Sequence, residues 1–416
     1  MARTRRIETK PLGGGHIRLS DLRGFHRLAS DATVGLTDVV EAMHHAIAST
    51  SPIFGESPEG RTSGITGTVY GSVRGVARLV GGGVDALLGM LAPLVTDTPS
   101  SQEREAVLAA LNGVLGDYLA ASANPLAIAM ALRAPGGVPL AIARDALAAA
   151  FPEPERKLLV LAHGLCMNDL EWNRSGHDHG ASLSRDLGYA PIYLHYNTGR
   201  HISTNGREFA DLMETLLREW PHPVERLAIV GHSMGGLVAR SACHYATLAG
   251  HAWPGRLNDL VFLGTPHLGV PLARAGAWAD LVVEISPYTK PFARLARIRS
   301  AGIHDLRYAD LRDEDWQRRA TPGGRVPRSR LPLPRGVRCY AAAASTQARP
   351  ASRGAKARGD GLVPLDSALG RHRDPSVDLG LPETRRWVGY GMGHFDLLSR
   401  AEVYARIRHW LSARTM

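Results

Sequence analysis

One six-residue stretch, Gly231–Gly236 with the sequence Gly-His-Ser-Met-Gly-Gly, limits what the residues around it can form. The apolar run 227–230 precedes it, and the run 237–243, which suits a helix, follows it. This order predicts a strand, a tight turn and a helix, with Ser233 at the apex. Glycines at positions 231 and 235 suit the turn, because a side chain at either position would collide with the adjoining strand or helix.

The pattern Gly-X-Ser-X-Gly in this setting is typical of a nucleophile elbow, a strained turn that raises a serine hydroxyl above the edge of a sheet. The following helix would point its first N–H groups at any negative charge that develops nearby. The alternative is a glycine-rich turn with an idle serine. We take Ser233 as the candidate nucleophile, and Gly231, His232 and Gly235 as residues that support it.

Apolar segments alternate with helical ones after residue 156, and this alternation predicts an α/β fold. We expect a mostly parallel sheet with helices on both faces. Right-handed crossovers would bring the carboxyl ends of the strands, and so the site, to one edge. The expected strands are 157–162, 191–196, 227–230, 260–263, 337–343 and 386–389, and the helices between them are 181–187, 208–220, 236–248 and 395–411.

The chain divides by composition into three parts. We expect a flexible basic tail over residues 1–15, an N-terminal helical region over 16–156, and the α/β domain over 157–416, after the prolines at 152 and 154. Segment 270–335 is too long for a simple connection, so it predicts a cap or lid. The alternative is an insertion without a gating role. Short helices are expected at 107–119, 125–132 and 139–151.

The N-terminal region holds a glycine-rich stretch, residues 65–95. Its glycines at 67, 71 and 75 would share one helix face. Such a face indicates either a closely packed helical hairpin or a helix that contacts a lipid surface. Charged residues interrupt the stretch, so it is a poor transmembrane span.

Charge and cysteine content exclude several classes of protein. The net charge of +10 comes almost wholly from arginine, and no segment alternates basic and aromatic residues, so we expect no nucleic-acid partner. The 3 cysteines do not suit a disulfide framework, and no Cys/His spacing indicates a zinc site. We therefore assign no metal ligand and no cofactor, and the sequence does not decide whether a structural calcium is present. The basic N-terminus lacks an apolar run after it, which predicts a cytoplasmic protein, with any membrane contact peripheral and made by the N-terminal helical region. The oligomeric state is not indicated.

A serine nucleophile needs a base and a carboxylate that orients the base. His394 lies after the last expected strand and follows glycines at positions 391 and 393, which allow a loop to reach Ser233. Asp360 precedes it in Gly-Asp-Gly-Leu-Val-Pro, in the order serine, acid, histidine. Asp366 is the competing acid. Among the other late histidines, His267 is expected to support the walls of the site.

The oxyanion formed during acyl transfer needs two N–H donors. Met234, directly after the serine, would supply one. The loop after residue 162 would supply the other from Leu165, with His163 and Gly164 shaping that loop.

Five motifs now stand in order: His-Gly-Leu, Gly-His-Ser-Met-Gly-Gly, Gly-Thr-Pro-His-Leu-Gly, Gly-Asp-Gly-Leu-Val-Pro and Gly-His-Phe-Asp. Together they resemble the bacterial lipase/esterase branch of the α/β-hydrolase family, over residues 157–412. The resemblance implies a Ser–Asp–His hydrolase with Ser233, Asp360 and His394 at the catalytic positions, and Leu165 and Met234 in the oxyanion hole. The first two strands of the family sheet are not evident, and the loop before the acid is enlarged with arginine.

We therefore expect a hydrolase of carboxylic esters that acts on an ester or lipid-like small molecule. An acyltransferase or thioesterase with the same triad is the alternative. A catalytically idle scaffold, or a protein that binds a lipid surface, is the hypothesis from another class.

Overall fold

The computed structural model describes residues 18, 20–34, 72, 74, 102–153, 156–270, 300–320, 331–350 and 357–412. The chain forms two compact units. The first comprises Met1–Arg104 and Ala121–Ala127, and the second comprises Glu105–Ala120 and Ile128–Met416.

The described part of the first unit is centred on one helical segment, residues 20–34. Asp21 is buried there, and the Arg104 guanidinium donates two hydrogen bonds to its carboxylate, each 2.6 Å long. Asn124 Nδ2 donates to Gly24 O at 3.1 Å. The glycine-rich stretch 65–95 lies outside the described residues apart from positions 72 and 74.

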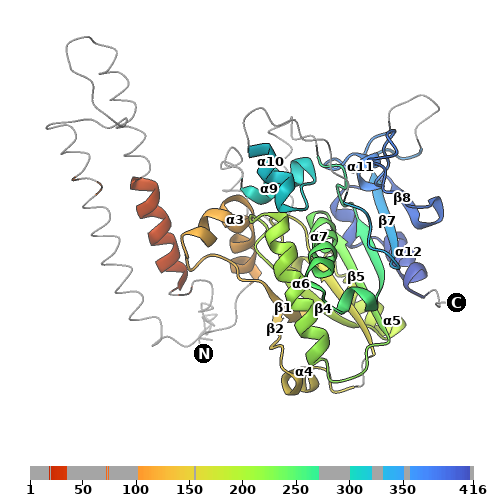
Figure 1. Ribbon diagram of the computed structural model, residues 1–416, viewed down its shortest axis with the longest axis horizontal. Coiled ribbons are helices and arrows are strands. Elements are labelled where there is room, and N and C mark those ends of the chain that lie inside the picture. Colours follow the sequence, from red (N-terminus) through yellow and green to blue (C-terminus); the bar gives the residue numbers. More distant parts are fainter. Residues whose placement is uncertain are drawn as a thin grey trace, which may run out of the picture. The chain divides into compact units, whose positions relative to one another are not determined.

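The second unit is built on a sheet of eight strands in the order β2-β1-β4-β3-β5-β6-β7-β8. Figure 1 shows this sheet with helices packed around it. All neighbours from β4 to β8 run parallel, and β1 is antiparallel to both β2 and β4. The predicted α/β fold with a mostly parallel sheet is confirmed. The strands are β1 (Ala131–Ala134), β2 (Val138–Pro139), β3 (Lys157–Ala162), β4 (Ala190–His195), β5 (Arg226–His232), β6 (Leu257–Leu263), β7 (Arg338–Ser345) and β8 (Arg386–Tyr390).

The central strands form because continuous apolar runs satisfy a sheet that is covered on both faces. In β3, residues 158–162 are fully buried, and this strand has the bounds expected from the sequence. The other five predicted strands are also confirmed, with ends that differ by a few residues.

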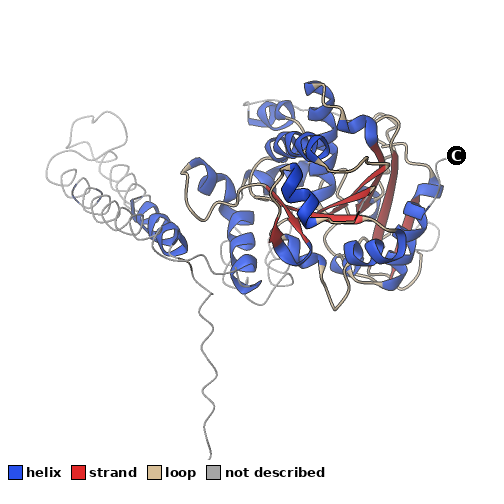
Figure 2. Cartoon of the chain, turned by 90° about the horizontal axis from the view of Figure 1, so that it is seen from below, coloured by secondary structure: helices blue, strands red, loops and turns tan. Residues whose placement is uncertain are grey.

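Helices cover both faces of the sheet (Figure 2). α6 packs on α7, and α12 packs on α5. The expected helix 395–411 is wrong as one element. It is a 3-10 turn, η7 (Phe395–Leu398), followed by α12, because Ser399 has non-helical backbone angles. The helices in this layer are α5 (His179–Leu187), α6 (Ile202–Glu219), α7 (Met234–Ala249) and α12 (Ala401–Ser412).

The segment before residue 156 corrects two expectations. No residue of 125–132 is helical, and α4 (Arg144–Ala150) covers only part of 139–151. Instead, β1 and β2 form a hairpin whose turn uses Gly136 and Gly137, both at positive φ. Pro139 fits β2 because an edge strand can leave one N–H position unpaired. These are the strands that the sequence left unrecognised. The expected helix 107–119 is confirmed within α3 (Gln102–Ala121), and the predicted domain bounds stay predictions.

The long segment after β6 is described only in part, since residues 271–299 and 321–330 lie outside the described residues. The described part forms α9 (Ala301–Tyr308) and α10 (Asp313–Ala320). Asp305 accepts from Ile202 N at 2.8 Å, which caps the start of α6. Arg207 pairs with Asp313 at 2.5 Å. These contacts fasten α9 and α10 to α6, while the expected lid stays a prediction.

The parallel strands all end at one edge of the sheet, which brings together loops from distant parts of the chain. In the described part of the chain, no helix combines the length and the apolar character that crossing a membrane requires.

Candidate active site

Ser233 lies at the apex of the turn between β5 and α7. Its φ of 53° and ψ of −123° are unusual for a residue with a side chain. Such a conformation costs about 1–3 kcal/mol and persists only where the surroundings hold it. Here Ser233 N donates to Leu263 O on β6 at 2.8 Å, and α7 begins at the next residue. Ser233 is 8% exposed, so the residue is largely enclosed by its surroundings.

The flanking glycines are required by close approach. A Cβ on Gly235 would overlap the Ala162 carbonyl at the end of β3, and one on Gly231 would lie 2.5 Å from Gly236 Cα. The strand and helix therefore meet at the turn without room for a side chain, as the sequence predicts.

Asp360 and His394 form a buried pair. His394 Nδ1 and Asp360 Oδ2 are 2.7 Å apart, and their side chains are 3% and 0% exposed. The second oxygen, Oδ1, accepts from Leu362 N at 2.9 Å and Val363 N at 2.7 Å. The carboxylate is thus held by its own loop on one side and presents its other oxygen to the imidazole.

The imidazole of His394 lies against the backbone that also binds Ser233. A Cβ placed on Gly264 would be 3.0 Å from His394 Cε1 and 3.1 Å from His394 Nδ1. Gly264 directly follows Leu263, whose carbonyl accepts the Ser233 N–H. The backbone of Ser233 and the ring of His394 therefore both lie beside the end of β6.

Asp366, the competing acid, lies elsewhere. It is an exposed residue in the first turn of α11 (Leu365–Ala368). Among the described residues, the carboxylate that contacts His394 is that of Asp360.

His232 is buried beside the pair. Its ring centroid is 4.7 Å from that of His394, and its Nε2 lies 3.4 Å from the His394 carbonyl oxygen. Burial, reinforced by the nearby His394, holds the pKa of His232 well below its ordinary value. His232 is therefore neutral at physiological pH and acts as a donor to the loop that carries His394.

The loop after β3 faces Ser233. A Cβ on Gly164 would lie 3.1 Å from Ser233 Cβ. His163 is fully buried, stacks on Tyr196 with centroids 4.4 Å apart, and its Nδ1 lies 3.0 Å from Gly164 O. Burial lowers the pKa of His163 to about 3, so this ring is neutral. These contacts fit the expectation that His163 orders the loop.

Leu165 and Met234 are the predicted oxyanion donors. Met234 is the first residue of α7, so its N–H has no carbonyl one turn earlier to bond. Leu165 is 3% exposed, and no acceptor within the described ranges takes its N–H. Met234 directly follows Ser233 in the chain, and Leu165 directly follows Gly164, which packs against Ser233.

His267 lies outside this group. Its ring packs edge-on against Phe262, and its Nδ1 lies 3.2 Å from Arg240 Nη1. Burial and the charge of Arg240 hold the pKa of His267 well below its ordinary value. This histidine packs against Phe262 near the end of β6 and so helps to hold that strand end in place.

Sequence reasoning missed two features of the site. It assigned no role to Gly264, although this glycine opens the Gly-Thr-Pro-His motif and makes room for the imidazole. It also missed a buried cluster of Glu105, Asp169 and His195, whose members are scattered along the chain without a motif.

Ligand atoms that could hold a metal meet at two places in the described part of the chain. One is the cluster of Glu105, Asp169 and His195, and the other joins His304, Asp305 and Asp310. Protein cations already contact both: Arg133 the first, and Arg319 the Asp310 carboxylate of the second. We assign no metal to either.

Comparisons with known proteins give distant likenesses. A family model described as a domain of unknown function (DUF7379) matches residues 149–305. No curated protein matches the chain.

Three solved structures illustrate the similarity. The mature lipase BlEst2 of Bacillus licheniformis is 16% identical, with 63% of this chain and 94% of that chain covered and a TM-score of 0.40. Lipase B of Aspergillus fumigatus is 10% identical, with coverages of 95% and 86% and a TM-score of 0.39. The esterase Pf2001 of Pyrococcus furiosus is 13% identical, with coverages of 62% and 82% and a TM-score of 0.36. We base the function on this chain's own residues.

Proposed function

We propose that this protein is a serine hydrolase that cleaves carboxylic esters through an acyl-enzyme on Ser233. The observation that carries the proposal is the buried His394–Asp360 pair, 2.7 Å apart, set against the strand end that also holds Ser233. A serine hydroxyl is a weak nucleophile, and a neighbouring imidazole oriented by a carboxylate is the usual means of activating it.

The first half of the reaction follows from this arrangement. Asp360 Oδ2 accepts from Nδ1–H of His394, which leaves the lone pair of Nε2 to take the Ser233 proton. Ser233 Oγ attacks the ester carbonyl carbon, and the carbonyl oxygen becomes an oxyanion. The N–H groups of Leu165 and Met234 would bind that oxyanion. The intermediate collapses to the acyl-enzyme, and His394 gives its proton to the departing alkoxide.

The second half repeats the same transfers with water. His394 Nε2 removes a proton from water, the hydroxide attacks the acyl carbon, and Ser233 leaves with that proton. The carboxylic acid is released, and serine and imidazole return to their starting states.

A panel of p-nitrophenyl esters of increasing acyl length tests the proposal. We expect turnover by the full chain and a fall in kcat of several orders of magnitude for Ser233→Ala. A fluorophosphonate probe should label the full chain at Ser233, and Ser233→Ala should stay unlabelled. Absence of both turnover and labelling would contradict the proposal and favour the idle-scaffold hypothesis.

The acceptor distinguishes hydrolysis from acyl transfer. If addition of a simple alcohol leaves most of the product as free acid, water is the acceptor; a transesterified product as the main species would indicate an acyltransferase.

A further inference from the structure

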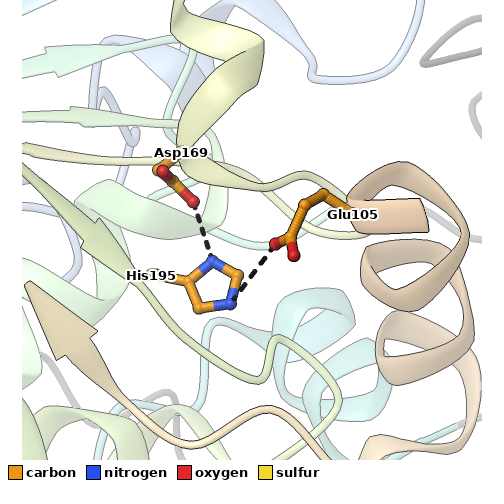
Figure 3. Close-up of side chains that lie close together, drawn as sticks. All are labelled: Glu105, Asp169 and His195. Carbon is orange, nitrogen blue, oxygen red and sulfur yellow. Dashed lines mark hydrogen bonds and ion pairs between the residues drawn. The ribbon is translucent and has the colours of Figure 1, made fainter. Parts of the chain in front are cut away.

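Four charged or titratable side chains from separate elements, three of them buried and one partly buried, meet beside the loop that follows β3. Arg133 Nη1 lies 3.0 Å from Glu105 Oε2 and 3.0 Å from Asp169 Oδ1. His195 Nδ1 lies 2.8 Å from the same Asp169 oxygen (Figure 3). The side chains of Glu105, Asp169 and His195 are at most 7% exposed, and that of Arg133 is 16% exposed. We call these four residues the Arg133 cluster.

The members of the Arg133 cluster join four elements. Glu105 belongs to α3, Arg133 to β1, and His195 is the last residue of β4. Asp169 is the first residue of η3 (Asp169–Trp172). One guanidinium bridges two carboxylates, so it supplies the positive charge that a metal would otherwise bring to them.

Asp169 is held as a carboxylate. Burial alone raises the pKa of its carboxyl, but the hydrogen bond from His195 and the charges of His195 and Arg133 outweigh burial. The pKa of Asp169 is therefore lowered below its ordinary value. A buried charge of this kind is stable only while its partners stay in place.

Asp169 connects the Arg133 cluster to the loop that carries the predicted oxyanion donor. Loop 163–168 runs from the end of β3 to Asp169 and carries Leu165. Between those ends, Cys166 N donates to Thr198 Oγ1 at 3.1 Å, and Cys166 adopts a φ of 58°. No acceptor in the described part of the chain fixes the Leu165 N–H itself. Met167 N also donates to Gly164 O at 3.3 Å, so the direction of the Leu165 N–H depends on these contacts within the loop and on how firmly its Asp169 end is held.

We propose that the Arg133 cluster positions loop 163–168, so that the Leu165 N–H points at the oxyanion formed on the Ser233 acyl adduct. The proposal rests on the function proposed above. Asp169 is a positioning residue, because it touches neither substrate nor Ser233 and acts through the loop that it ends.

The test replaces Asp169 by its isostere and follows two quantities. For Asp169→Asn we expect kcat with a p-nitrophenyl ester to fall about tenfold or more, with KM nearly unchanged, because an oxyanion donor acts only on the charge that develops. A trifluoromethyl ketone, which forms a tetrahedral adduct with serine, should lose affinity by a similar factor. A purely structural defect would not move both together at unchanged KM.

The chain provides a matched control near the amino ends of the parallel strands, away from the candidate site. Asp259 is fully buried and pairs with Arg226 at 2.8 Å and Arg338 at 2.9 Å, where β5 and β7 begin. Asp259→Asn should lower the melting temperature while leaving kcat and the affinity for the ketone unchanged.

A second pair of variants keeps the test decisive if Asp169→Asn does not fold. His195→Leu removes the donor to Asp169 and should repeat the kinetic defect, whereas His195→Asn keeps an N–H where Nδ1 lies and should restore most of the activity. Equal effects of Asp169→Asn and Asp259→Asn, or equal activity of the two His195 variants, would overturn the inference. A wild-type protein without turnover would instead overturn the proposed function.

Discussion

At the scale of single residues, the two oxygens of Asp360 have separate tasks. Oδ1 is bound by the backbone of its own loop, and Oδ2 faces His394. The carboxylate cannot turn without losing two N–H donors, so the imidazole is held in one tautomer as well as in one place.

The first prediction concerns this tautomer. Asp360→Asn should keep the fold but reduce kcat by about 10⁴-fold, because an amide N–H facing Nδ1 favours the wrong tautomer. Asp366→Asn is the control and should match the wild type in a p-nitrophenyl ester assay. The reverse result would restore Asp366 as the acid.

The second prediction concerns Gly264, which has a φ of 58°. Gly264→Ala should displace the imidazole of His394 and lower kcat about tenfold or more, since its Cβ would meet the ring at 3.0 Å. Gly250 also has a positive φ, 72°, but has open space around it. Gly250→Ala should therefore lower the melting temperature with no change in kcat. Similar kcat values for the two variants would show that Gly264 matters for its backbone alone.

At the scale of elements, the sequence predicts strands that are buried on both faces of the sheet better than it predicts the strands β1 and β2 at one edge. The predicted strands β3 to β7 are readable because each is apolar and buried along most of its length, whereas β8 is an edge strand with one buried residue. β1 and β2 have no such run: Ala-Leu-Arg-Ala carries one buried residue, and Val-Pro carries none. Their pairing is decided by tertiary contact with β4, which local propensity does not contain.

The same distinction holds for the candidate site. Ser233, Asp360 and His394 could be selected because each stands in a glycine-bounded motif at a strand end. The Arg133 cluster could not, since its members come from four elements and meet only when the sheet edge is assembled.

The third prediction concerns α9 and α10. Asp305 of α9 contacts the start of α6, and Arg207 of α6 pairs with Asp313 of α10. In addition, Trp316 Nε1 of α10 donates to Ser203 Oγ of α6 at 3.2 Å. We expect the amides of 301–308 to exchange with deuterium on the same minutes-to-hours scale as those of α6. Exchange of 301–308 within seconds, with α6 still protected, would show that this part of the insertion opens.

At the scale of the whole molecule, neutral buried histidines make stability depend on pH. Burial lowers the pKa of His163 to about 3 and of His179 to about 4, and holds those of His232 and His267 well below the ordinary 6.5. Since the unfolded chain binds these protons more readily, stability is lost as pH falls below about 6.5. Burial raises the pKa of Asp305 in the folded protein to about 6, above its ordinary value of 3.8. Between these two values the folded state binds more protons, so this residue increases stability as the pH falls.

The fourth prediction concerns this loss of stability at lower pH. The free energy of unfolding, measured with denaturant, should fall between pH 6.5 and 5 by up to about 1.4 kcal/mol per pH unit for each buried histidine. His179→Gln should flatten the curve by at most one such contribution. His409→Gln, at an exposed position of α12, should leave the slope as it is. A wild-type curve that is level over this range would contradict the assignment of neutral histidines.

The pairing of β6 with β7 has a practical consequence. These neighbours in the sheet are separated in the chain by the long segment after residue 263, with Ser233 before it and both Asp360 and His394 after it. A polypeptide divided within that segment would leave the proposed nucleophile on one fragment and the proposed base on the other. If the proposed ester cleavage is correct, such fragments, fused to two proteins that bind each other, would regain it only on reunion, and the colour of a released nitrophenol would report the association.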